Sequence, residues 1–180
     1  MNIKELDLLE KQEMRNKVIS RTEVLDKVGD LLLLPETEYA TTEQVADYYK
    51  VDTTAIRQIL VRNNGEILSD GYVVWKAENF KSDNMSQLKV TTRRGSFDVE
   101  FSNGKVERFS PRGVGLFPKR AILRVGMLLR DSEIAKEVRT RLLDIVHDVE
   151  QENPEIIENI ASEITEEKQL MLDRVEAEMN

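Results

Sequence analysis

The chain has 180 residues, of which 40% are apolar, and this is enough for a core in one or two small domains. It contains no cysteine, one histidine and no run of about 20 apolar residues, which excludes disulfides and thiolate metal sites and predicts no membrane span. The net charge of -8 does not exclude nucleic-acid binding, because residues 81–141 carry a net charge of +7 and residues 142–180 one of -10.

Three helices are predicted in the first third of the chain. Apolar residues recur with a loose period of 3.6 between residues 3 and 30 and predict one long helix there. Pro35 prevents this helix from continuing. Thr41 or Thr42 is expected to cap a second helix that ends near Tyr49. A third helix is expected to begin at an Asp52 cap and to stop near Asn63, because Asn64-Gly65 is a stop signal.

Residues 41–63 have the spacing of a helix-turn-helix, in which two short helices meet around a small shared core. Ile56 and Ile59 are expected to bury one face of the second helix. Its other face carries side chains that bind base edges and phosphates in a DNA major groove, namely Thr53, Thr54, Arg57, Gln58 and Arg62. A solvated helix face and a protein-contact surface are the alternatives. Lys50 lies in the turn, where many such motifs have glycine because the backbone favours positive φ.

Strand patterns follow the helix-turn-helix. Residues 72–75 form a short β-type run, and a strand or hairpin there would make the domain a winged variant. Residues 81–84 are a plausible linker. From residue 96 the pattern has a period of two, with Phe97, Val99 and Phe101 on one face before an Asn103-Gly104 turn, which predicts a β-hairpin.

The hairpin also carries carboxylates. Asp98 and Glu100 then face outward, where ion pairing with Lys105 or Arg108 is the ordinary explanation and a metal-dependent nuclease site the remote one.

Two basic groups are candidates for phosphate contact, although solvated loops explain them equally well. The first is Arg93-Arg94 beside Gly95, where a glycine helps the backbone approach a duplex. The second combines one residue of the expected 110–115 loop with three of the helix that follows: Arg112, Lys119, Arg120 and Arg124. Lys119 and Arg120 fall in a first helical turn that disfavours cations, which suggests a bound anion.

The last third of the chain is expected to be helical. Pro118 is placed as a first helical residue, and Asp131 or Ser132 caps the next helix. Pro154 interrupts that helix, and residues 151–180 form an acidic C-terminal helix. This tail is either a solvated helix or a segment that contacts the basic middle of the chain and weakens nonspecific DNA binding.

Two segments resemble known families. The stretch from Val24 to Val74, with its ATTEQVADYYKV and EILSDG motifs, resembles the N-terminal part of a phage- and plasmid-borne bacterial helix-turn-helix family. The stretch FPKRAILRVGMLLRDSEIAKEVRTRLLDI is similar to the closing helices of phage antirepressors with Bro-N and KilA-N type domains. The resemblance implies a cytoplasmic, DNA-associated regulatory protein of a prokaryote or phage.

The sequence therefore predicts an α+β fold, mostly α, with three parts. Residues 1–80 are the helix-turn-helix domain, residues 85–150 a β-hairpin with helices, and residues 151–180 the acidic helix. We expect no enzyme, no metal and no cofactor, because a phosphate-binding glycine loop and a nucleophile–base pair are missing.

The expected function is sequence-specific binding of double-stranded DNA by a homodimeric, cytoplasmic transcription regulator without membrane contact. The alternative is an antirepressor-like factor that binds and inactivates another regulator, with acidic residues 144–178 as its active surface.

Overall fold

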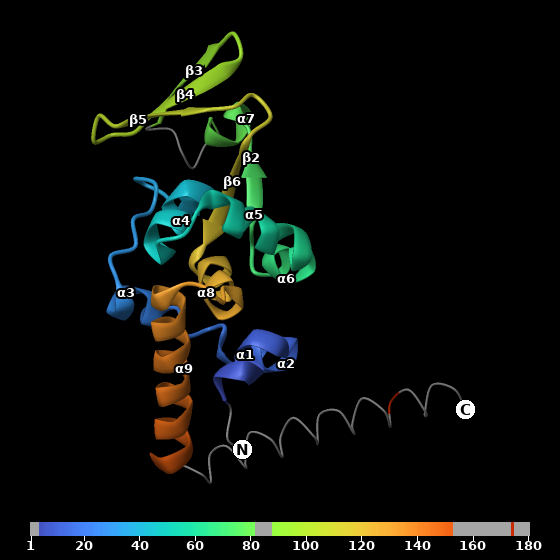
Figure 1. Ribbon diagram of the computed structural model, residues 1–180. Helices are drawn as coiled ribbons and strands as arrows, with labels where there is room; N and C mark the ends of the chain where they lie inside the picture. Colours follow the sequence, from blue (N-terminus) through green and yellow to red (C-terminus); the bar gives the residue numbers. More distant parts are fainter. Residues whose placement is uncertain (1–3, 82–87, 153–173, 175–180) are drawn as a thin grey trace.

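The computed structural model describes residues 4–81, 88–152 and residue 174, which form an α+β fold that is mostly helical, as expected (Figure 1). The helices are α1 (Glu5–Glu10), α2 (Gln12–Val18), α3 (Glu23–Val28), α4 (Thr42–Tyr49), α5 (Thr53–Arg62), α6 (Asn64–Ser69), α7 (Ala77–Phe80), α8 (Lys119–Leu128) and α9 (Glu133–Glu152). The strands are β1 (Tyr39–Thr41), β2 (Val73–Trp75), β3 (Lys89–Arg93), β4 (Ser96–Glu100), β5 (Val106–Phe109) and β6 (Val114–Pro118).

The first sheet has the strand order β1–β6–β2, and both outer strands run antiparallel to β6. Ala40 of β1 lies opposite Phe117, and Val74 of β2 lies opposite Gly115. Glycine is required at position 115 because a Cβ there would collide with the hydroxyl of Tyr72. Since β1 directly precedes α4 and β2 follows α6, this sheet holds the α4–α6 segment at both ends.

The position of β6 differs from the sequence prediction. Residues 110–115 were expected to form a loop, but β6 begins at Val114 because it pairs with β1 and β2 on either side. The strand expected at residues 72–75 exists as β2, and it joins this sheet rather than a local hairpin. The ranges 1–80 and 85–150 thus contribute strands to one sheet.

The helix pair α4–α5 has the boundaries that the sequence predicts. The Thr41 hydroxyl accepts a hydrogen bond from the backbone N–H of Gln44, and the Gln44 side chain accepts one from the backbone N–H of Thr41. Lys50 ends α4 in the left-handed conformation, with φ 56° and ψ 47°. α5 ends at Arg62, as predicted, but Asn64-Gly65 begins a further helix, α6, rather than a loop.

A helical core joins these helices to α8 and α9. Ile56 and Ile59 of α5 are buried, as expected, together with Ala46 and Tyr49 of α4. The Tyr49 hydroxyl donates to the carbonyl oxygen of Ile122 in α8, at 2.6 Å. This hydrogen bond satisfies the one polar atom of a fully buried side chain and fixes α4 against α8.

The second sheet, β3–β4–β5, lies at the far end of the molecule from α9 (Figure 1). Phe97, Val99 and Phe101 are buried on one face, as the period of two predicts, and Asn103-Gly104 lies in the turn before β5. These side chains form a second core, which includes Phe80 of α7. Residues 93–95 are not a loop as expected, because Arg93 ends β3 and only Arg94-Gly95 forms the turn to β4.

The single helix expected over residues 3–30 is instead three helices. The chain is extended at Lys11, with φ -117° and ψ 112°, and this separates α1 from α2. The break allows Arg15 to donate hydrogen bonds to the carbonyl oxygens of Leu8 and Leu9, at 3.0 and 3.2 Å. Arg15 also binds Glu66 of α6, so the broken helix docks onto the segment after α5.

The C-terminal helices begin close to their expected positions. Pro118 is the residue before α8 rather than its first residue. Ser132 caps α9, because its hydroxyl accepts the backbone N–H of Ala135 at 3.1 Å. The expected helix over residues 151–180 lies outside the described residues, apart from the last turn of α9 and Arg174.

Candidate nucleic-acid interface

The exposed side of α5 is a mainly polar stripe. Thr54, Arg57, Gln58 and Arg62 are all exposed, and their spacing of three or four residues places them on one side of the helix. Val61, which is 81% exposed, lies in the same stripe. Since the opposite side is buried against the helical core, α5 presents this stripe in one direction.

The start of α5 is fixed by its cap. The Asp52 carboxylate accepts a hydrogen bond from the backbone N–H of Thr54 at 3.0 Å. Hydrogen bonds from the backbone and side chain of Thr54 hold the pKa of Asp52 below its usual value, so the cap carries a negative charge at neutral pH. Thr53 is half-buried and its hydroxyl turns to Asp52, at 3.4 Å, so it belongs to the cap more than to the stripe.

A groove of about 310 Å³ separates α4 and α5 from the segment around β5 and β6. On the helix side it is lined by Thr41, Thr42, Glu43 and Arg57. On the sheet side it is lined by residues 107–110 and 113–115, among them Arg108. The polar stripe of α5 is therefore continuous with a polar groove, and an arginine lies on each side of it.

Arg93 and Arg108 share one carboxylate on the outer face of the second sheet. Arg93 Nε lies 2.7 Å from Asp98 Oδ2, and Arg108 Nε lies 2.9 Å from Asp98 Oδ1. The hydrogen bonds from Arg108 and Arg93 hold the pKa of Asp98 below its usual value. The ion pair with Arg108 that the sequence predicts is confirmed, while Lys105 pairs instead with Glu107, at 3.2 Å. Arg94, in the adjoining turn, is exposed.

The second predicted basic group is dispersed in the structure. Arg124 is buried, with 2% of its surface exposed, and binds the carboxylate of Asp70. Its assignment to a basic surface is wrong, because the side chain is buried against Glu66 of α6 and Asp70, the residue that follows α6. Lys119 lies 3.3 Å from Asp26, and Arg120 is exposed.

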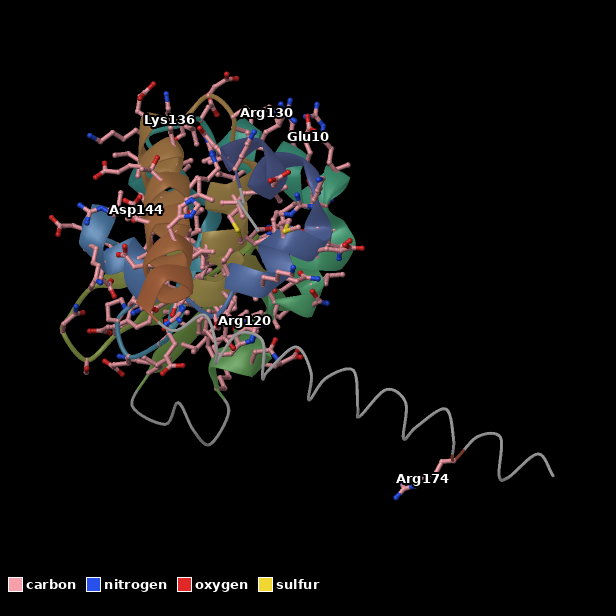
Figure 2. All side chains as sticks on the ribbon, turned by 90° about the horizontal axis from the view of Figure 1, so that it is seen from below. Glu10, Arg120, Arg130, Lys136, Asp144 and Arg174 are labelled. Carbon is pink, nitrogen blue, oxygen red and sulfur yellow. The ribbon has the colours of Figure 1, made fainter. Side chains whose placement is uncertain are left out.

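The positive charge of residues 81–141 is therefore not one surface. Arg112 precedes β6 and Lys119 follows it, so the length of that strand, about 3.4 Å per residue, keeps them apart. Figure 2 shows Arg120 and Arg130 on opposite sides of the helical end of the molecule. Arg139 is buried and donates to the carbonyl oxygen of Gly126, so it adds nothing to the surface charge.

The part of the chain that the structure describes contains neither a metal-binding cluster nor a helix that could span a membrane. In residues 4–81 and 88–152, no group of three or more histidine and carboxylate side chains is placed to hold a metal ion. Over the same described residues, every helix is too short or too polar to cross a membrane.

Sequence reasoning did not single out two features of this interface. Arg108 was assigned only an ion pair, although the Asn103-Gly104 turn sets the register that places it opposite Asp98. The groove was not foreseen, because it brings α4 and α5 next to strands about 50 residues later. Comparison with family models, curated proteins and solved structures found no significant match for this chain.

Proposed function

We propose that this protein binds double-stranded DNA in a sequence-specific manner and regulates transcription, as proteins of phages and mobile elements do. In this proposal α4, the turn at residues 50–52 and α5 act as a helix-turn-helix, and α5 enters the major groove. The observation that carries the proposal is the exposed stripe of Thr54, Arg57, Gln58 and Arg62 on a helix whose other side is buried.

Each member of the stripe has a role in this proposal. Arg57 is suited to guanine O6 and N7, and Gln58 to adenine N6 and N7, with about 1–3 kcal/mol of discrimination for each bidentate contact. Arg62, at the end of α5, is suited to either a base or a phosphate. Thr53 and Thr54 lie in the first turn, and their hydroxyls are suited to a phosphate.

Arg93, Arg94, Lys119 and Arg120 are proposed as phosphate contacts outside α5. Arg93 and Arg94 extend the interface onto the second sheet. A homodimer is also part of the proposal, because one short helix buries little surface and two half-sites double it. Light scattering on the full chain should give the mass of a dimer, and a monomer at micromolar concentration would contradict this part.

The test is selection of duplexes from a random library with the full chain, followed by footprinting of the enriched site. Replacing both Arg57 and Arg62 by Ala should abolish the footprint while circular dichroism and thermal unfolding stay unchanged. A footprint that survives in this double variant would refute the assignment of α5. Failure to enrich any duplex at low salt would refute DNA binding and favour the antirepressor-like alternative.

A further inference from the structure

On the outer face of the second sheet, the carboxylate of Asp98 lies between Arg93 and Arg108 and accepts hydrogen bonds from both. The strand register places Thr91, Asp98 and Arg108 side by side on β3, β4 and β5. Arg93 lies two residues from Thr91 and therefore shares its face of the sheet. Because Phe97 and Val99 face the core, this row is held on a sheet whose other side is packed.

Asp98 fixes both arginines while leaving them open to solvent. The Asp98 side chain is only 10% exposed, whereas those of Arg93 and Arg108 are 55% and 65% exposed. Asp98 takes one N–H of Arg93 and two of Arg108, although each guanidinium has five. The unused N–H groups are thus available in a fixed orientation.

The charge of this cluster fits a phosphodiester. Two guanidinium groups and one carboxylate carry a net charge of +1, which one phosphate oxygen pair would neutralise. A guanidinium presents a planar fork that matches phosphate oxygens, and little side-chain freedom is lost on binding if the fork is already held. Arg108 also lines the groove that Arg57 lines from α5.

We propose that Asp98 holds Arg93 and Arg108 as a preset pair that binds a backbone phosphate of the DNA, across the groove from Arg57. This inference rests on the proposed function and adds Arg108 as a phosphate-binding residue and Asp98 as a positioning residue. In this proposal the phosphate belongs to the duplex that α5 reads, because Arg57 and Arg108 line the same groove of the protein.

The experiment measures affinity of the full chain for its selected duplex across a series of salt concentrations. Arg108→Ala and Arg93→Ala should each weaken binding about tenfold, the effect of one hydrogen bond to a charged group. Each should also lower the slope of log K against log salt by about one. Arg141→Ala is the matched control, because Arg141 is exposed on α9 at the other end of the molecule and should change neither quantity.

The direction in which Asp98→Asn changes DNA affinity shows whether Asp98 positions the two arginines or only reduces the positive charge. If the arginines act only as free charges, removal of a negative charge strengthens DNA binding. If Asp98 holds them in place, binding weakens, and this is the expected result. Arg108→Lys provides a second variant, which should keep the salt slope and lose affinity because the fork is lost.

One phosphate can be located by replacing it with a neutral methylphosphonate. At the contacted phosphate, the modified duplex should bind wild type and Arg108→Ala equally, as expected when both changes remove one interaction. Tighter binding by Asp98→Asn overturns the positioning role, and unchanged affinity in Arg108→Ala overturns the phosphate contact. If either of these results is found while Arg57→Ala/Arg62→Ala still abolishes binding in the same assay, this inference fails and the proposed function stands. No binding by the wild type refutes both.

Discussion

Replacement of Asp70 by Asn tests whether buried ion pairs hold the segment after α5 in place. The Asp70 carboxylate accepts two hydrogen bonds from Arg124, at 2.6 and 3.0 Å, and both residues are buried. Loss of one partner of such a pair costs about 3–5 kcal/mol because the other charge stays buried. Arg124 also lies 3.1 Å from Glu66 and donates to Asn16 at 2.7 Å, so we expect the lower end, about 3 kcal/mol.

Urea unfolding followed by circular dichroism measures this free energy, and the melting temperature should fall by about 6–12 °C. The double variant Arg124→Met/Asp70→Leu should recover much of the loss, because an apolar pair of similar volume leaves no charge unpaired at that position. A loss below about 1 kcal/mol for Asp70→Asn would refute the reasoning, since that is the range of exposed ion pairs.

Three further variants test local features. Gly126→Ala should lower the free energy of unfolding by about 1–3 kcal/mol, because its Cβ would collide with the Tyr49 hydroxyl, and Tyr49→Phe in the same chain should restore part of it in urea unfolding. Lys50→Gly should raise the free energy of unfolding by about 1 kcal/mol, and with it the melting temperature, because Lys50 has a positive φ that glycine adopts without strain. A lower melting temperature would contradict this. The pKa of Asp98 is lowered on folding, so its ion pairs stabilise the protein above the usual value of 3.8 and this contribution is lost as the pH falls below it. In acid, the free energy of unfolding should therefore depend less on pH for Asp98→Asn than for the wild type. The same pH dependence in both proteins would count against these ion pairs.

Sequence reasoning succeeded where the determinants lie within a few residues of each other. Thr41 and Asp52 set the starts of α4 and α5 through bonds to residues two or three positions away. The alternation that includes Phe97 and the Asn103-Gly104 turn fixed β4 and β5 in the same local manner.

The failures involve long-range partners. Residues 114–118 have little strand character of their own and become β6 by pairing with segments at residues 39–41 and 73–75. Arg124 follows an amphipathic pattern that could not reveal its burial, because the compensating charge comes from Glu66 on α6 and from Asp70 just after it. The groove beside Arg57 was missed for the same reason, since its two walls come from distant parts of the chain.

The central place of β6 has a consequence for synthesis on the ribosome. While residues 1–80 emerge, β1 and β2 lack the strand that lies between them, and Tyr49 of α4 lacks the α8 carbonyl that it binds. The α4–α5 segment therefore cannot complete these contacts until about residue 122 has left the exit tunnel. A nascent chain that stalls earlier carries α4 and α5 without the support of β6 and α8.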